Sequence, residues 1–445
     1  MTTEFSISTE WTTALHGAES LRQTSAFLRI DFGERVATRI EDEWSRSTSE
    51  RVWLAAYPLA LWFASSWWRL RWEPYPISGL PTVSWRMAHE MASAGYGFLW
   101  PRLLFNSDGE NVWAICRATH PGDHQPVRYL SEFRSCVPGK LFERVIDEFV
   151  DLVLARLDAV GARAPELQEL WNEVRAERHD PEAFRHRRLE ACLGFEPDEA
   201  PSEAVNGLLG LLGAAGDAAL AEIAPACAGR DPVGALASVT ELARQQGTEG
   251  TIRVPKALAQ PIEELERQHL APWERGWRLA RAARAAWGVP PGCVSDRDLA
   301  GIFDMPAGIL NRDSEGQWSR RLGLAVRNGS PERLKLLFRK PRHAGRRFEA
   351  ARFLADHLLA PETDRWLPAT DAKTARQKMQ RAFAAEFLSP IATLREYFGD
   401  DYSQEAIEDA SRHFIVSPLT ISSHLANNGL ISPDDVPSPV TELPL

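Results

Sequence analysis

The first side chains along the chain that could bind a metal are His89 and Glu90. Two histidines at positions i and i+4 of a helix can hold one Zn²⁺, and a glutamate beside the first can activate the bound water. Ser93 stands where the second histidine is needed, so we expect a polar pair on an amphipathic helix. His120 and His124 have the same spacing, but a proline and a glycine between them indicate a loop.

Basic side chains are concentrated in residues 312–352, which hold 12 Lys and Arg against 4 Asp and Glu. The whole chain has a formal net charge of −10, which excludes a protein that coats nucleic acid along its entire length. The charge is unevenly divided: −12 over residues 1–250, +8 over 251–360 and −6 over 361–445.

The basic segment is either a solvated face or a surface for an acidic partner, which could be nucleic acid or the acidic N-terminal part of this chain. Two short strands are expected to carry it, because apolar residues alternate with other residues over 322–327 and again over 334–339. The candidate binding residues are Arg339, Lys340, Arg342, Arg346 and Arg347.

The elements around these candidates predict an α+β fold that is predominantly α-helical. Residues 1–137 contain ten of the 16 Trp and are expected to form an α+β domain with an aromatic core. Residues 138–244 are expected to be helical, because apolar stripes recur at three- and four-residue spacing and a small-residue stretch follows. We expect a linker over 245–254, a third domain over 255–432, and a Pro-rich disordered tail over 433–445.

Composition also bears on the compartment. The five Cys include no Cys-x-x-Cys pair, and an odd number of scattered thiols is typical of a reducing cytoplasm. The start of the chain lacks the basic and apolar regions of a secretory signal. The apolar stretch from Val52 to Trp68 is shorter than the ~20 residues that span a bilayer, so we expect a buried helix or helix pair and no membrane association.

From Pro272 onward the sequence resembles the ImmA/IrrE metallopeptidase family. Residues 272–289 are similar to the helix that opens its catalytic domain, and residues 381–390, Arg-Ala-Phe-Ala-Ala-Glu-Phe-Leu-Ser-Pro, resemble a later helix. Residues 410–431 are similar to its C-terminal helices. The resemblance covers about residues 270–432 and implies a small zincin-like α+β domain. Active members of this bacterial family cleave transcriptional repressors in mobile-element or stress responses.

Between these pieces the family places a His-Glu-x-x-His zinc helix. In this chain Arg352 stands at the first His, Phe353 at the catalytic Glu and Asp356 at the second His. The third ligand position falls near Gln377 or Met379, neither of which is a carboxylate. A guanidinium is permanently protonated and cannot bind a metal cation. The resemblance therefore implies a metallopeptidase-like domain with a degenerate motif and no metal cofactor.

The positions of the motif also predict a replacement for the metal. Arg352 and Asp356 are four residues apart, so we expect them to form an ion pair, with Glu349 nearby, that fills the former cleft. In the helices that follow, we expect Asp371 to cap a helix that ends near residue 388. Ser417 should cap the last helix, which should stop at Asn428 and Gly429.

The leading hypothesis is a non-catalytic regulatory or scaffold protein that binds a protein partner in a bacterial stress-response, mobile-element or phage-defence system. Two alternatives stay open. One is a nucleic-acid-associated factor that uses the basic segment 312–352. The other is an active zinc endopeptidase, whose candidate ligands are His343, His357 and Glu386.

Overall fold

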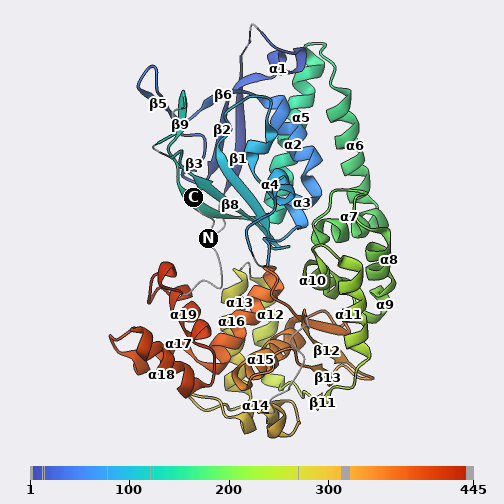
Figure 1. The fold of residues 1–445 in the computed structure, drawn as a ribbon, viewed down its shortest axis with the longest axis vertical. Helices are drawn as coiled ribbons and strands as arrows, with labels where there is room; N and C mark the ends of the chain where they lie inside the picture. Colours follow the sequence, from blue (N-terminus) through green and yellow to red (C-terminus); the bar gives the residue numbers. More distant parts are fainter. Residues whose placement is uncertain are drawn as a thin grey trace. The chain divides into compact units, whose positions relative to one another are not determined.

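The structure is a computed structural model, and it describes residues 4–12, 14, 16–77, 79–120, 122–123, 125–268, 270–311 and 321–436. The fold is α+β and mostly helical, as predicted (Figure 1). The chain divides into two compact units. Unit 1 comprises Met1–Pro76 and Pro81–Ala200, and unit 2 comprises Ile77–Leu80 and Pro201–Leu445. The division falls inside the helical region expected over 138–244, so the first helices of that region belong to unit 1.

Unit 1 contains small antiparallel sheets beside helices. One sheet consists of β1 (Phe5–Trp11), β2 (Ser25–Phe32), β3 (Arg35–Val36) and β6 (Val52–Ala55). A second consists of β7 (Arg102–Ser107), β8 (Asn111–Arg117) and β10 (Phe133–Pro138), and a third of β4 (Ile40–Asp42), β5 (Ser47–Ser49) and β9 (Val127–Tyr129). Every second residue of β8 is buried, as a strand with one face on the core requires.

The helices of unit 1 carry its aromatic core. They are α1 (Glu19–Gln23), α2 (Ala56–Ser65), α3 (Trp67–Trp72), α4 (Val83–His89), α5 (Gly139–Ala159), α6 (Pro165–His179) and α7 (Pro181–Leu193), with a 3-10 turn η1 (Met91–Ala94). The apolar stripe of α5 faces the core as predicted. The stretch from Val52 to Trp68 is helical only after Ala55, because its first four residues form β6. No described helix is long and apolar enough to cross a membrane.

Unit 2 begins with four helices: α8 (Ser202–Gly210), α9 (Leu212–Ala215), α10 (Asp217–Cys227) and α11 (Pro232–Arg244). The linker predicted over 245–254 is wrong. Its residues form β11 (Thr248–Thr251), which pairs antiparallel with β13 (Arg333–Leu337). The backbone of an edge strand can pair with a sheet whatever its side chains are, so side-chain composition did not reveal this strand.

The rest of unit 2 packs helices against one sheet. The remaining strands are β12 (Gly323–Arg327) and β14 (Trp366–Ala369), and β12 and β13 are the two strands predicted from alternation. The helices are α12 (Ala259–Arg267), α13 (Pro272–Ala286), α14 (Asp296–Ile302), α15 (His343–Leu359), α16 (Ala375–Leu388), α17 (Ile391–Phe398), α18 (Gln404–Phe414) and α19 (Pro418–Asn427). Short 3-10 turns are η2 (Lys256–Leu258), η3 (Ala307–Ile309) and η4 (Pro433–Asp435). The disordered tail predicted over 433–445 is wrong for its first residues, which form η4, and residues 437–445 lie outside the described residues.

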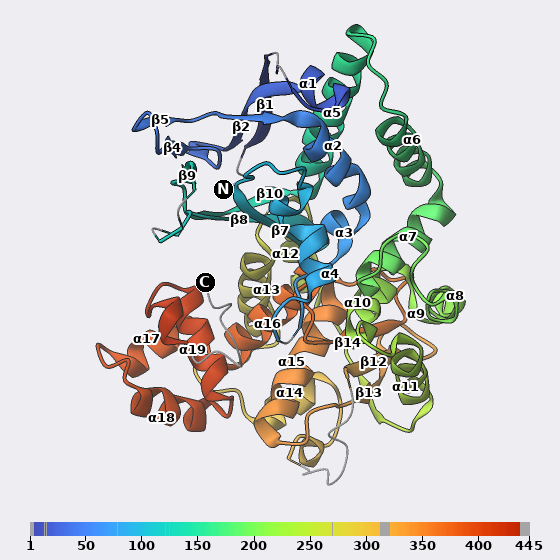
Figure 2. The same cartoon turned by 45° about the horizontal axis from the view of Figure 1, so that its top comes forward.

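The sheet order in unit 2 is β11-β13-β12-β14, with β12 antiparallel to both of its neighbours. Strands β13 and β14 therefore run parallel to each other and end at the same edge. Helix α15 follows β13, and α16 follows β14. Helices α10 and α11 lie beside this sheet, where they contact β14 and β12 (Figure 2).

Helix α13 packs closely on α16, and a glycine permits it. A Cβ at Gly276 would lie 2.5 Å from the backbone oxygen of Met379, so no larger side chain fits there without a shift of the backbone. The predicted cap at Asp371 is wrong: α16 is capped by Thr374, whose Oγ1 accepts from the backbone N–H of Gln377. Ser417 caps α19 as predicted.

Candidate functional site: a buried polar cluster at the motif positions

Helix α15 carries the three positions of the degenerate motif, and its second half is enclosed by the fold. Every residue from Glu349 to Leu358 is buried. The helix contacts β12, β14, α13 and α16. A charged side chain on this part of α15 therefore has to find its partners inside unit 2.

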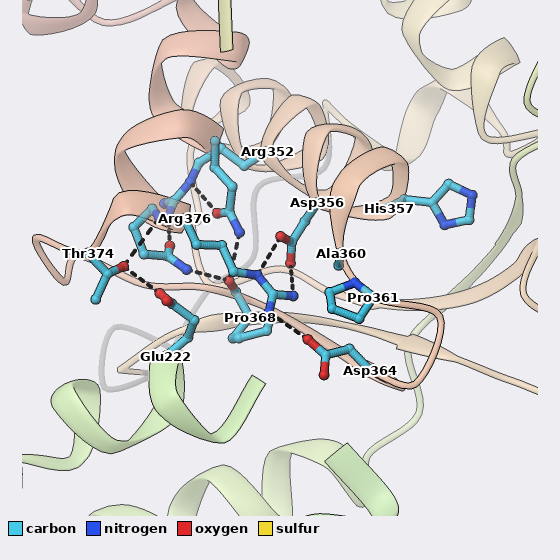
Figure 3. Close-up of polar contacts among 12 residues, drawn as sticks. Glu222, Arg352, Asp356, His357, Ala360, Pro361, Asp364, Pro368, Thr374 and Arg376 are labelled. Carbon is cyan, nitrogen blue, oxygen red and sulfur yellow. Dashed lines mark hydrogen bonds and ion pairs between the residues drawn. The ribbon is translucent and has the colours of Figure 1, made fainter. Parts of the chain in front are cut away.

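Arg352, at the first motif position, crosses from α15 toward α16 (Figure 3). Its Nη2 donates to the backbone oxygen of Thr370 at 2.6 Å and to the side-chain oxygen of Gln377. Its Nε donates to Gln380 Oε1 at 3.2 Å. All three acceptors are neutral, and Arg352 is only 3% exposed. A buried cation held by amide and carbonyl oxygens thus occupies the first motif position.

The pKa of Arg352 reflects this surrounding. Burial, reinforced by Arg381 and Arg339, lowers its pKa to about 9. The side chain therefore stays protonated at neutral pH, but its charge is less stabilised than that of an exposed arginine. The more distant carboxylates of Glu349 and Asp371 act in the opposite direction without cancelling this effect.

Asp356, at the second motif position, does not pair with Arg352, and the predicted intrahelical ion pair is wrong. Its two oxygens accept from Nε and Nη2 of Arg376 on α16, at 2.7 and 2.8 Å. Arg376 Nη1 also donates to Asp364 Oδ2 at 2.6 Å (Figure 3). A bidentate guanidinium from the facing helix offers better geometry than an arginine one turn earlier in the same helix.

Gln377, near the third motif position, links α16 to the sheet. Its Oε1 accepts from Arg352 and from the backbone N–H of Thr370, and its Nε2 donates to the backbone oxygen of Pro368 at 2.9 Å. Positions 352 and 377 are therefore in direct contact. Met379, the alternative third position, is buried at the α13 contact and takes no part in the cluster.

Glu222 enters the cluster from α10 (Figure 3). Its carboxylate accepts from Thr374 Oγ1 at 2.5 Å, and burial raises its pKa. Sequence reasoning missed both Glu222 and Arg376. A signal for Glu222 exists, because it is a lone carboxylate in the apolar middle of an Ala-rich helix, and such a residue needs a buried partner.

Glu349 was expected beside the Arg352–Asp356 pair, but its carboxylate binds the backbone of the turn that follows β13. Its Oε2 accepts from the backbone N–H groups of Arg339 and Lys340 at 2.7 and 3.2 Å. Burial raises the pKa of this carboxyl group. Phe353, which the resemblance aligns with a catalytic glutamate, is fully buried and packs on Phe338.

The alternative zinc ligands are not brought together. His343 and His357 lie fourteen residues apart on α15, about 21 Å along the helix axis. His343 bonds to Asp296 at 2.7 Å, and Glu386 bonds to Arg281 and His424. Within the described ranges, no three His, Cys, Asp or Glu residues are grouped closely enough to hold a metal ion.

Two of the five candidate binding residues are buried in the fold. Arg347 donates to the backbone oxygen of Val294 and to Asp296, and Arg346 donates to the backbone oxygen of Ile309 at 2.9 Å. The expected basic surface therefore does not include them. The arginine stems pack against the protein while the guanidinium groups reach backbone oxygens, which composition alone does not reveal.

The other three candidates lie in the turn between β13 and α15. Arg339 donates through both Nη atoms to Asp371, at 2.7 and 2.9 Å. Lys340 and Arg342 are exposed. Residues 312–320, at the start of the basic segment, lie outside the described residues.

In unit 1, His89 is the last residue of α4 and is fully buried, and Glu90 follows it as the C-cap of that helix. Its ring nitrogens contact Glu73 Oε2 and the backbone oxygen of Phe105, each at 2.9 Å, and the ring stacks on Trp85. Glu90 pairs with an arginine of α4. His120 lies in a loop as predicted, and His124 is outside the described residues.

Comparisons with protein-family models, with curated proteins and with solved structures find no match for this chain. Its function has to be inferred from the site itself.

Proposed function

We propose that unit 2 is a metallopeptidase-like domain of the ImmA/IrrE type that has exchanged its metal for a guanidinium, and that the protein is a non-catalytic regulatory or scaffold protein that binds a protein partner. The observation that carries this proposal is the contact between Arg352 and Gln377. In the resemblance Arg352 stands at the first zinc ligand, and the third ligand falls near Gln377 or Met379. Here a permanent cation and a neutral amide occupy positions 352 and 377.

Two further features support a domain without catalysis. Phe353 is buried against Phe338, so the position of the family's general base contributes to the apolar core. Asp356 is fully engaged by Arg376 and does not offer a free ligand. A proton acceptor and an open coordination site are both needed for metal-assisted hydrolysis.

The zinc endopeptidase alternative is less well supported, because His343 and His357 are about 21 Å apart on one helix. The nucleic-acid alternative is weakened because Arg346 and Arg347 donate to backbone oxygens inside the protein and are not available to a ligand. No observation favours either of these two functions over the regulatory one.

The test is a zinc analysis of the purified full chain, combined with mapping of new protein N-termini in cells that express it. We expect no stoichiometric zinc and no cleavage products that depend on the protein. Stoichiometric zinc that is lost in His357→Ala, or cleavage that this substitution abolishes, would establish the endopeptidase instead. The matched control is His413→Ala, which changes a histidine far along the chain in α18.

A further inference from the structure

Two turns of unit 2 meet at one edge of its sheet. Strands β13 and β14 end at the same edge because both pair antiparallel with β12. Residues 338–342 connect β13 to α15, and residues 370–374 connect β14 to α16. The bidentate bond from Arg339 to Asp371 joins the two turns directly. The N-termini of α15 and α16, where the helix dipole is positive, therefore also lie near this edge.

Four basic side chains, three from these turns and one from α16, act on Asp371. We call them the turn cluster: Arg339, Lys340, Lys373 and Arg381. Lys340 and Lys373 are exposed, whereas Arg381 is half-buried and donates to the backbone oxygen of Ala372 at 3.0 Å. Two of the four, Lys373 and Arg381, lie outside the basic segment 312–352.

The turn cluster carries more positive charge than its carboxylates balance. Asp371 is bonded to Arg339, and it is the only carboxylate that hydrogen-bonds to a side chain of the cluster in the described part of the chain. Glu349 lies 3.8 Å from Arg339, but it accepts two backbone N–H groups. Lys340, Lys373 and Arg381 are left without a carboxylate partner among the described residues.

Arg352 adds to this excess of positive charge, because it acts on Lys340 and Asp371 while its own hydrogen-bond acceptors are all neutral. Burial and the neighbouring Arg339 lower the pKa of Lys340, and burial and Arg381 lower that of Lys373. Bringing these cations together costs free energy, and a bound anion would recover it.

We propose that the turn cluster binds a compact anion with two negative charges, a terminal phosphate group presented as inorganic phosphate or as a small-molecule phosphate monoester. All four cations lie within electrostatic reach of one residue, Asp371, and a compact cluster of this kind suits a single dianionic group. A nucleic-acid backbone carries one charge per phosphate and is followed by cations spaced along a groove. The proposal does not depend on the metallopeptidase resemblance and would stand if that resemblance failed.

The test is calorimetric titration of the full chain with inorganic phosphate and with phenyl phosphate. We expect binding that weakens as the salt concentration rises. Lys340→Ala combined with Lys373→Ala should weaken binding by about tenfold or more, because two charge-assisted contacts are removed. Lys256→Ala, an exposed lysine of η2, is the matched control and should leave affinity unchanged. Tighter binding of phenyl phosphate than of phosphate would identify an ester as the ligand, and equal binding would identify the free anion.

Asp371→Asn gives a second, opposite prediction. This substitution removes the carboxylate that competes for Arg339, so phosphate should bind a few-fold more tightly. Affinity that stays the same in the double lysine variant would overturn the proposal. So would an absence of binding to the native chain, or binding of single-stranded DNA that phosphate does not displace.

Discussion

Both units of the molecule bury arginines almost completely, and two of these, Arg69 and Arg352, one from each unit, are neutralised in different ways. Arg69 in unit 1 is 2% exposed and donates to Glu73 at 2.6 Å and to Glu196 at 2.8 Å. Arg352 in unit 2 is 3% exposed and donates only to neutral oxygens. Burial acts to lower the pKa of Arg69, but the two carboxylates outweigh it and the pKa is raised, whereas that of Arg352 is lowered.

Arg69 therefore forms a structural ion pair, whereas Arg352 is a buried cation without a carboxylate partner in its hydrogen bonds. Arg69 belongs to a closed network in which carboxylates match the cation, and His89 bonds to one of the same carboxylates. Arg352 joins α15 to α16 and to the turn after β14, while its charge has no carboxylate partner in its hydrogen bonds. It therefore contributes to the positive potential around the turn cluster, whereas Arg69 contributes little beyond its own network.

The largest effect is expected at Arg69. Replacing Arg69 by Met leaves Glu73 buried without its main partner, and breaking a buried ion pair in this way costs about 3–5 kcal/mol. Chemical denaturation followed by tryptophan fluorescence measures the loss, because unit 1 holds most of the tryptophans. A decrease in the free energy of unfolding below about 1 kcal/mol would show that the ion pairs of Arg69 contribute no more than exposed ones do.

The next effect concerns His357, a buried base with no hydrogen-bond partner at Nδ1. Burial, with a contribution from Arg327, lowers its pKa to about 4, against an ordinary value of 6.5, while Asp356 acts in the opposite direction. The unfolded chain therefore takes up a proton between these values and the folded chain does not. The contribution of the neutral His357 to the free energy of unfolding is fully present above pH 6.5. It is lost toward pH 4, by roughly 1.4 kcal/mol per pH unit.

Substitution of His357 by Leu should remove this contribution and flatten the pH dependence of stability between pH 6.5 and 4. Denaturation midpoints measured at several pH values give the comparison. His89→Leu is not a suitable control, because it breaks the Glu73 network, so His413→Ala on α18 is used. If the stability of His357→Leu falls as steeply between pH 6.5 and 4 as that of the native chain, His357 is not the group that causes this fall.

A smaller effect is expected at Arg352. Replacing Arg352 by Met removes hydrogen bonds to Thr370, Gln377 and Gln380 but leaves no carboxylate unpaired. It also removes the desolvation cost of a buried cation, so the net loss should be about 1–2 kcal/mol, well below that for Arg69→Met. Both variants are measured by the same denaturation experiment. An equal or larger loss for Arg352→Met would mean that its neutral acceptors compensate the charge as well as carboxylates do.

The sequence predicted the parts of this picture that depend on local periodicity. The strands of the basic segment, the cap at Ser417 and the amphipathic helix that became α5 follow from residue spacing over a few turns. The partner of Asp356 could not be predicted in this way, because Arg376, which also donates to Asp364, reaches Asp356 through the packing of α16 on α15. Spacing within one helix suggested Arg352 as the partner, and tertiary geometry offered a better donor.

The candidate site shows the same limit. The residues at positions 352, 353 and 356 could be proposed from the sequence, but the buried carboxylate of Glu222 comes from a helix about 130 residues before Arg352. Arg346 and Arg347 looked like surface cations because composition cannot distinguish a solvated guanidinium from one bonded to backbone oxygens. Long-range partners of this kind require the fold itself.

The central claim is that Arg352 stands where a metal would bind, and a ligand graft tests it most directly. The variant combines Arg352→His, Asp356→His and Gln377→Glu, which leaves Phe353 in the core and Asp364 as a partner for Arg376. Zinc binding is measured by competition with a chromophoric chelator, with folding checked by circular dichroism. We predict about one zinc ion per chain for the variant, lost when Gln377 is restored. A folded variant that binds no zinc would contradict the claim.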